Sequence, residues 1–405
     1  MSGAPPRSVV VIGGGIVGLS TGLALQARGL AVIILDAPGS QAPASAGNAG
    51  HIAVEQHEPL ASFASLRSLP GRLMSRGGPA SFPAGATAQW LPFGARLLRA
   101  AAPHRFARGK QALGALLTEA LPAWRRLLEG VGAPDLLRPQ GNITAWESRA
   151  AATRARAALR GFDSPVARWR DLTAAEAALL AGQVRSAPAD AIRFEGSASV
   201  ADPAAVLDAL RSAFESRGGV VEARAATLAE ARRRGADLLV VAAGVRSAAL
   251  MREIGTRVPL IAERGYHIQS AESAWPLALP SVVFAERAVV ATRFRSGLRA
   301  TSFIEFTRPD APADPRKWER LKAHAAALGL PFAAPVDTWL GSRPTLPDYL
   351  PAIGRSRRDP RVLYCFGHQH LGLTLGPLTG ELVATLACAE APALDLSPFA
   401  VERFG

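Results

Sequence analysis

The sequence predicts an α/β protein in which a parallel-sheet domain, discontinuous along the chain, is interrupted by a second domain with an antiparallel sheet and extra helices. Three observations support this fold class. Short, wholly apolar, β-branched runs recur at the beginning, middle and end of the chain, and such runs are typical of strands buried on both faces. The first two runs flank a single helix. The intervening text is helical in one part and strand-like in another.

The N-terminal residues contain a complete β-α-β unit. "SVVVI" (8–12) is expected to form a buried strand, "LSTGLALQARG" a helix that ends at Gly29, and "AVIILD" (31–36) a second strand. A helical crossover between two strands of one sheet makes them parallel. The unit therefore predicts a parallel sheet.

Further elements of the same kind follow much later. Asp202 is placed to cap a helix that has Pro203 in its first turn and stops at Gly218, which are the usual start and stop signals. "DLLVVAAG" (237–244) and "VLYCFG" (362–367) read as buried strands, and "PLTGELVATLACAE" (377–390) as a helix that starts at Pro377.

The remaining segments predict the second domain. Residues 86–195 contain Ala/Leu/Arg-rich amphipathic helices and few strand signals, whereas 259–310 contains strand-like text such as "GYHIQS" and "LRATSFIEF". We assign 1–85, 196–258 and 338–405 to the nucleotide-type domain, and 86–195 and 259–337 to the second domain.

The composition is ordinary for a globular protein except for its charge. The formal net charge is +13, and all but three of the 46 basic residues are arginine. Aromatic residues make up only 6%, and no nucleic-acid motif interleaves them with the basic residues, so we expect no nucleic-acid partner. Cys365 and Cys388 form no metal pattern, and no run approaches the roughly 20 apolar residues of a spanning helix. We expect a cytoplasmic protein without a metal site.

The turn after the first strand carries the most direct chemical signal. Gly13, Gly15 and Gly18 satisfy G-x-G-x-x-G between strand and helix, and Asp36 follows at the end of the second strand. In a Rossmann-like unit these glycines permit a tight turn, close approach of a pyrophosphate and close helix–strand packing. The helix N-terminus attracts the phosphates, and the acid accepts ribose hydroxyls. The sequence thus predicts a dinucleotide site.

The loop "SAGNAGHIAVEQHEPLA" (45–61) is built mostly from small residues and follows the second strand closely. Together with "VVVIGGGIVGLS", "DLLVVAAGVRS", "GSRPTLPDYLPAIG" and "GHQHLGLTLGPLTGEL", it resembles the FAD-dependent amino-acid oxidase and dehydrogenase superfamily, and within it the D-amino-acid dehydrogenases. The matching pieces cover about a third of the chain. The resemblance implies a Rossmann-like FAD-binding domain with an antiparallel-sheet substrate domain.

The resemblance also implies which residues bind FAD. The small-residue loop would pass along the isoalloxazine ring, with Ser45, Asn48 and backbone groups bonded to its heteroatoms. Relatives with covalent flavin carry His where this chain has Asn48, so we expect non-covalent FAD. Relatives usually have a small antiparallel excursion before "DLLVVAAG", where this chain has only "AEARRRGA" (229–236), so we expect a reduced adenine end of the site. The predicted FAD-binding residues are Gly13, Gly15, Ile16, Val17, Gly18, Asp36, Ser45, Asn48, Ala49, Gly50, His51, Ile52, Thr227, Ala243, Gly244, Gly372, Leu373 and Thr374.

The same resemblance implies the substrate contacts. Arg343 in "GSRPTLPD" matches the arginine that grips the substrate carboxylate, and a guanidinium suits this role because it donates two parallel hydrogen bonds. Tyr266 and His267 fall where relatives place a residue over the flavin, and they alternate faces on a strand, so we expect one of them in the pocket. His51 points either at the site or into the structure. His368 and His370 are weaker candidates.

The resemblance implies oxidation of a D-amino acid to its imino acid by hydride transfer from Cα to FAD, with an amino-acid substrate and a quinone or other electron acceptor as partners. A glycine- or sarcosine-type oxidase is one alternative. A flavin-carrying subunit of a hetero-oligomeric dehydrogenase, dependent on partner subunits, is another.

Two finer expectations concern the substrate and the membrane. "GNAGHIAVEQHEPLA" and "ERGYH" most resemble the bacterial D-hydroxyproline dehydrogenases, which predicts cis-4-hydroxy-D-proline as the substrate. The stretch from Pro59 to Thr118 has no Asp or Glu and carries basic and apolar residues. This pattern predicts a peripheral contact with the inner face of the membrane, with a solvated basic face as the alternative.

Overall fold

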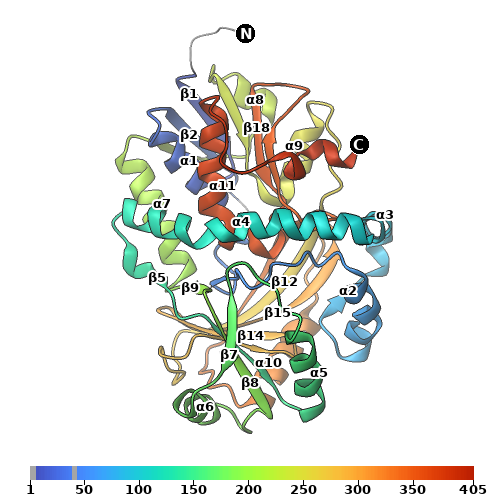
Figure 1. Ribbon diagram of the computed structural model, residues 1–405. Coiled ribbons are helices and arrows are strands. Elements are labelled where there is room, and N and C mark those ends of the chain that lie inside the picture. The colour runs from blue at the N-terminus through green and yellow to red at the C-terminus, as the bar shows by residue number, and fades with distance from the viewer. Residues whose placement is uncertain (1–5, 39–42) are drawn as a thin grey trace.

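A computed structural model describes residues 6–38 and 43–405, so residues 1–5 and 39–42 of the predicted 1–85 segment lie outside the described residues. One half of the molecule is organised around a six-stranded sheet in the order β10-β2-β1-β11-β18-β17 (Figure 1). All neighbours in it are parallel except β17, which pairs antiparallel with β18. The strands are β1 (Ser8–Ile12), β2 (Ala31–Asp36), β10 (Val220–Ala223), β11 (Leu238–Val241), β17 (Ala352–Arg355) and β18 (Val362–Phe366). The predicted strands at 8–12, 31–36, 237–244 and 362–367 are confirmed.

Helices α1 (Ile16–Gln26) and α11 (Gly372–Ala387) pack tightly against each other beside this sheet. A Cβ atom at Gly380 would lie 2.6 Å from the backbone of Ser20, so only glycine permits this approach. Helix α7 (Pro203–Ser216) packs on α1, with Asp202 accepting from the first-turn N–H groups and Gly218 at a φ of +82° beyond its end, as expected. Short helices α8 (Leu228–Arg232) and α9 (Ser247–Arg252) flank β11.

Helix α11 begins at Gly372, five residues before the predicted start at Pro377, so that prediction was wrong. A proline inside a helix leaves the carbonyl four residues earlier without its N–H partner. Here that carbonyl belongs to Leu373, and the indole N–H of Trp124 donates to it at 3.0 Å. A contact from a distant helix therefore lets α11 extend through the proline.

The second half is organised around a nine-stranded sheet in the order β16-β12-β15-β14-β13-β6-β8-β7, with β4 paired to β15. It is antiparallel apart from the β13–β6 and β15–β4 pairs. Helices α10 (Pro315–Leu328), α5 (Arg149–Leu159) and α6 (Ala174–Ala181) lie around it (Figure 1). The strands are β4 (Ala80–Ser81), β6 (Asn142–Trp146), β7 (Arg168–Asp171), β8 (Asp190–Glu195), β12 (Ile261–Ser270), β13 (Ser281–Phe284), β14 (Val289–Phe294), β15 (Gly297–Thr307) and β16 (Asp337–Thr345).

The predicted domain limits need correction at two places. Strand β16 lies in the predicted FAD-binding segment 338–405 but pairs with β12 of the second sheet. Helix α4 (Pro103–Gly130) lies in the predicted substrate segment 86–195, yet its apolar residues join the core around α1 and α11. The segment 86–195 also contains strands β5 to β8, which its few strand signals did not indicate.

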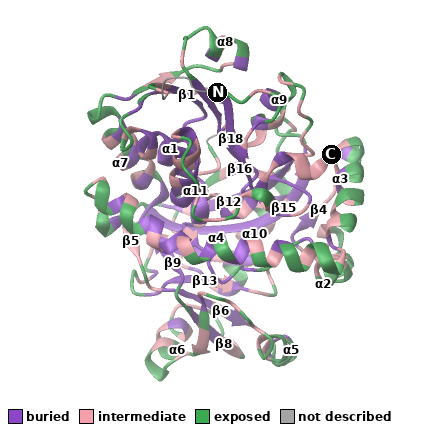
Figure 2. Cartoon of the chain, turned by 45° about the horizontal axis from the view of Figure 1, so that its top comes forward, coloured by how far each residue is buried: buried purple, intermediate pink, exposed green. Residues whose placement is uncertain are grey.

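Strands β3 (His51–Ile52), β9 (Ala198–Val200) and β5 (Leu137–Arg138) form a separate three-stranded sheet. Helices α2 (Phe63–Ser68) and α3 (Thr87–Ala100) lie at one edge. Figure 2 shows most strands of the two main sheets buried, although the edge strands β7 and β10 contain no buried residue, and it shows α3, α5 and α6 largely exposed. Among the residues described, no helix has the length and hydropathy needed to cross a bilayer.

Candidate active site

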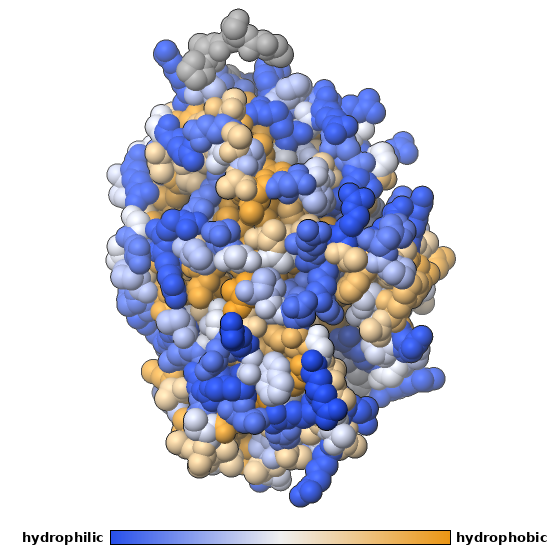
Figure 3. Space-filling view, in the orientation of Figure 1, coloured by the Kyte–Doolittle hydropathy of each residue, from blue (hydrophilic) through white to orange (hydrophobic). Residues whose placement is uncertain are grey.

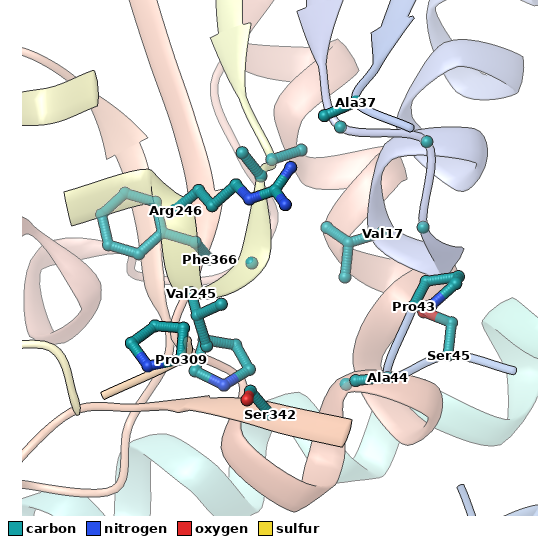
Figure 4. Close-up of a pocket in the computed structure, with 18 of the residues that line it drawn as sticks. Val17, Ala37, Pro43, Ala44, Ser45, Val245, Arg246, Pro309, Ser342 and Phe366 are labelled. Carbon is teal, nitrogen blue, oxygen red and sulfur yellow. The ribbon is translucent and has the colours of Figure 1, made fainter. Parts of the chain in front are cut away.

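A cavity of about 820 Å³ extends from the carboxyl ends of β1, β2 and β11 to the face of β16. Its volume is that of a small-molecule or cofactor site. Figure 4 shows Val17 and Ser45 on one side of the cavity and Val245 and Arg246 on the other. Of the predicted FAD-binding residues, those that line it are Gly13, Gly15, Ile16, Val17, Asp36, Ser45, Asn48, Thr227, Ala243, Gly244, Gly372 and Leu373.

The turn between β1 and α1 forms the first end of the cavity. Gly13 has a φ of +115°, and a Cβ atom at Gly18 would lie 1.8 Å from the carbonyl oxygen of Gly13. Gly18 therefore acts in helix–strand packing and does not line the cavity. Helix α1 has no side-chain cap and no acidic residue in its first turn. Its N-terminus offers N–H groups and a positive dipole end to an anion, which suits a pyrophosphate.

Asp36 lies at the end of β2, beside this turn. Its Oδ1 accepts from the N–H of Gly14 at 2.9 Å, and its Oδ2 lies 3.6 Å from Nη2 of Arg211. The carboxylate is thus held at the edge of the cavity with acceptor capacity left over. This position suits hydrogen bonds from the hydroxyls of a ribose.

The loop 45–52 runs along the middle of the cavity. Ser45 accepts from the N–H of Ile16 at 3.0 Å, which ties the loop to α1. The side-chain amide of Asn48 is bonded within the loop, to the carbonyl of Ser45 and the N–H of Gly50. Each end of this amide makes one bond within the loop and keeps capacity for another. Asn48 also lines the cavity, so its contact with the flavin stays a prediction.

Four of the predicted cofactor residues lie behind this surface. Gly50 has a φ of +68° and packs against Phe294, because a Cβ atom there would lie 2.3 Å from the ring. Ile52 is fully buried in the core around α1 and α11. Thr374 is also buried, and its Oγ1 accepts from the N–H of Ala53 at 3.0 Å. These residues and Ala49 do not line the cavity; they hold the loop in place.

Arg343 forms the other end of the cavity. It is paired across β16 and β12 with Glu263, which is buried, and its Nη1 lies 3.4 Å from Oε1 of that carboxylate. Glu263 also accepts from the hydroxyls of Thr345 and Tyr349, each at 3.1 Å. One edge of the guanidinium is therefore anchored.

Gly265 makes room for this guanidinium, since a Cβ atom there would lie 2.4 Å from Nη2 of Arg343. The Arg343 side chain remains 27% exposed, although Glu263 beside it is nearly inaccessible. A guanidinium held on one edge and accessible on the other can take a carboxylate through two parallel bonds. The prediction for Arg343 thus has a geometry that fits it.

Tyr266 does not lie in the cavity, which corrects our expectation. Strand alternation turns its side chain to the opposite face of β12, into the core that contains α10 and Leu340. Its hydroxyl donates to Glu305 at 2.9 Å and accepts from the N–H of Asp314 at 3.2 Å. Burial raises the pKa of this phenol well above its usual value.

His267 lies on the cavity side of β12 but is covered. Its ring stacks on Trp339 at a centroid distance of 4.9 Å, and its Nδ1 is 2.9 Å from the carbonyl oxygen of Gly47. Burial, and then the charge of Arg299, lowers the pKa of His267 to about 3, so the imidazole is neutral. Neither Tyr266 nor His267 lines the cavity, contrary to the expectation that one of them would.

His51 lies next to the cavity without lining it. Its Nε2 is 2.7 Å from Oε1 of Glu55, and both side chains are about nine-tenths buried. In the described part of the chain, His51 Nδ1 and Glu55 Oε2 have no hydrogen-bond partner. His370 lines the cavity, and burial, followed by the charges of Arg343 and His51, lowers its pKa to about 3.

Sequence reasoning missed Trp339 and Arg246, which both line the cavity. Trp339 precedes Arg343 by four residues on β16, so the two-residue period of a strand places both on one face. Arg246 directly follows the turn after β11. It could have been found from "DLLVVAAGVRS", because the carboxyl end of a central parallel strand is where such sheets bind ligands.

The comparisons with known proteins decide the family. Residues 8–386 match the family described as FAD dependent oxidoreductase. The chain belongs to that family. A D-amino-acid oxidase of Bradyrhizobium diazoefficiens is 30% identical over 98% of this chain and 99% of its own length. A "D-amino acid dehydrogenase 2" of Ralstonia nicotianae is also 30% identical, over 98% of this chain and 100% of its own.

A solved structure shows the same fold. The crystal structure of glycine oxidase from Geobacillus kaustophilus has a TM-score of 0.67 and 22% identity, covering 98% of each chain. The protein is therefore an FAD-dependent oxidoreductase with the family's α/β architecture.

The residues present fit the cofactor. The turn at Gly13 and Gly15, the first turn of α1 and Asp36 have the geometry for the dinucleotide part of FAD, and the loop at Gly47 leads from there to Arg343. When bound, FAD supplies the acceptor for a hydride. Burial keeps His370 neutral, so this residue adds no charge beside Arg343.

Proposed function

We propose that this protein oxidises a D-amino acid at its Cα–N bond, with FAD as the hydride acceptor. The observation that carries the proposal is Arg343 at the far end of the dinucleotide cavity, anchored by buried Glu263 and accessible on its other edge. This arrangement fits a substrate carboxylate. The names of the two relatives at 30% identity support an amino-acid substrate of D configuration.

The test is anaerobic bleaching of the bound flavin by a panel of D- and L-amino acids. Because no acceptor is present, bleaching reports only the reductive half-reaction. The proposal expects bleaching by one or more D-amino acids and none by their L-isomers. Faster bleaching by L-isomers, or by glycine or sarcosine alone, would refute it in favour of another substrate class.

We further propose cis-4-hydroxy-D-proline as the best substrate. The support is chemical: a ring hydroxyl needs a hydrogen-bond partner, and His370, with His51 and Glu55 behind it, provides polar groups close to Arg343. A site that bonds the hydroxyl should disfavour D-proline, because the analogue leaves a polar group unpaired. The cyclic product can be trapped as a coloured adduct with an aminobenzaldehyde. Equal kcat/KM for D-proline would contradict this assignment.

We propose that FAD is bound non-covalently. We also propose that the electron acceptor is a quinone or another non-oxygen acceptor. The relatives carry both names, oxidase and dehydrogenase, so their names do not decide the acceptor. Oxygen consumption measured against quinone-analogue reduction, with the purified single chain, separates the two. Turnover that requires an added protein would instead favour the alternative of a flavin-carrying subunit.

We also propose that the edge of the molecule formed by α2 and α3 contacts the membrane. Leu91 and Leu98 on α3 are 58% and 55% exposed, and Phe63 on α2 is 53% exposed. Figure 3 shows apolar side chains beside hydrophilic ones at this edge. Arginines in the same stretch, such as Arg96 and Arg99, are exposed as well. Exposed apolar residues among cations suit a surface of anionic lipid.

A further inference from the structure

The loop beside the cavity is held from behind by side chains of the second sheet. Four consecutive backbone carbonyls, from Ala46 to Ala49, each face a side-chain nitrogen or hydroxyl of this sheet. Arg299 Nη1 donates to Ala46 O at 3.0 Å and to Asn48 O at 2.7 Å. His267 Nδ1 lies 2.9 Å from Gly47 O, and Thr292 Oγ1 donates to Ala49 O at 3.0 Å. The three side chains come from β15, β12 and β14.

This arrangement fixes the direction of the peptide groups. In a trans peptide the N–H points opposite to the C=O, so carbonyls turned to the sheet leave the following N–H groups turned away from it. The N–H of Gly50 is taken by Asn48 Oδ1. Within the described chain, the N–H groups of Gly47, Asn48 and Ala49 have no acceptor. Because Gly47 and Asn48 line the cavity, this edge of it presents backbone donors.

Arg299 adds a buried positive charge behind these donors. The residue is only 6% exposed, and its guanidinium lies 4.8 Å above the ring of Phe294. Its Nε donates to Gln269, and none of the ion pairs formed by described residues includes it. Burial lowers its pKa to about 10, and among the described residues the charge of Asp202 opposes this shift in part. A buried charge without a counter-ion is costly.

The position of the loop indicates which group compensates the buried positive charge of Arg299. The phosphate turn and Asp36 occupy one end of the cavity and Arg343 the other, with the loop at Gly47 between them. A bound FAD would have its dinucleotide part at the first end, and its redox-active ring would then lie along the loop. Reduction adds negative charge to that ring. The unpartnered N–H groups and the charge behind them are directed at the part of the cavity where this charge develops.

We propose that Arg299 is a positioning residue that, with His267 and Thr292, holds the loop N–H groups toward FAD and raises the reduction potential of the bound cofactor. The proposal concerns the cofactor alone and does not depend on the amino-acid substrate. It also assigns His267 to the loop and not to substrate binding.

Three variants of the holoenzyme separate the effect of the loop position from the effect of the Arg299 charge. Arg299→Gln removes the charge and retains one donor group. Arg299→Lys retains the charge but has no planar fork to reach two carbonyls at once. Thr292→Val removes one loop contact without changing any charge. Three quantities are measured: the midpoint potential of bound FAD, the dissociation constant of its sulfite adduct and the dissociation constant of FAD itself. Sulfite is informative because its adduct adds negative charge to the flavin. None of them requires turnover.

For Arg299→Gln we expect sulfite binding to weaken at least tenfold and the potential to fall. A tenfold change in the two-electron equilibrium is about 30 mV. Arg299→Lys and Thr292→Val should weaken FAD binding severalfold while sulfite affinity stays within about threefold. Wild-type potential and sulfite affinity in Arg299→Gln would overturn the proposal. If Arg299→Gln yields no holoenzyme, unchanged dissociation constants for both sulfite and FAD in Arg299→Lys and in Thr292→Val would overturn it.

Discussion

Replacing Arg343 with Leu should abolish most turnover and also destabilise the protein, for two separable reasons. The guanidinium is the group at the end of the cavity suited to a carboxylate. Truncating one partner of a buried charge pair costs about 2–5 kcal/mol, which at 1.4 kcal/mol per factor of ten is a loss of roughly 30-fold to several thousand-fold in kcat/KM. The spectrum of the bound FAD should change little.

The stability effect arises from Glu263. Without Arg343, this buried carboxylate keeps, among the side chains of the described residues, the hydroxyls of Thr345 and Tyr349 as donors. Burial and the adjacent Glu263 raise the pKa of Tyr349 well above its usual value, so that hydroxyl stays protonated and continues to donate. A buried group that loses part of its compensation costs about 1–3 kcal/mol of unfolding free energy. Arg343→Leu should therefore lower the Tm as well.

A double variant separates the two effects. Glu263→Gln removes the carboxylate charge while keeping an oxygen acceptor for the hydroxyls. The Tm of Arg343→Leu/Glu263→Gln should rise relative to that of Arg343→Leu, whereas kcat/KM should remain low. The assays are thermal unfolding of the holoenzyme and anaerobic bleaching at several substrate concentrations. Recovery of kcat/KM in the double variant, or near-normal kcat/KM in Arg343→Leu, would refute the assignment of Arg343 to the substrate carboxylate.

Three further outcomes are expected. Acid precipitation of the yellow protein should release FAD into the supernatant, and flavin left in the pellet would contradict non-covalent binding. Gly18→Val should yield colourless protein, because even a Cβ atom there would lie 1.8 Å from the carbonyl oxygen of Gly13. The pKa of His267 falls from 6.5 to about 3 on folding, so the unfolded chain binds more protons and stability should drop as pH falls from 6.5 toward 3. His267→Gln, measured by Tm from pH 7 to pH 4, should decline less steeply than the wild type, and an equal slope would argue against this titration. Leu91→Ser/Leu98→Ser should reduce salt-sensitive co-sedimentation with anionic liposomes, and equal binding of the wild type to neutral liposomes would speak against the membrane contact.

Much of the fold was predictable because its signals are local. Apolar β-branched runs become buried strands wherever they occur, Asp202 caps the helix that follows it, and Gly13 permits a backbone conformation that other residues rarely adopt. The dinucleotide end of the cavity was likewise predictable, since strand, glycine turn, helix and Asp36 follow one another within a single β-α-β unit. Arg343 was found through a resemblance and not through a local signal.

The rest depended on contacts between residues far apart in sequence. Alternation along β12 predicts that Tyr266 and His267 face opposite sides, but only sheet packing decides that the first meets α10 and the second meets the loop carbonyl of Gly47. Helix α11 passes through Pro377 because Trp124, on another helix, satisfies the carbonyl that the proline frees. Arg299 had no sequence signal among so many arginines, and its burial behind the loop 45–52 distinguishes it. By itself the sequence determined the buried strands, the turn and the caps, since these depend on neighbours along the chain. Only the tertiary structure decided which side chains reach the cavity, because burial and hydrogen-bond partners are set by elements that meet only after folding.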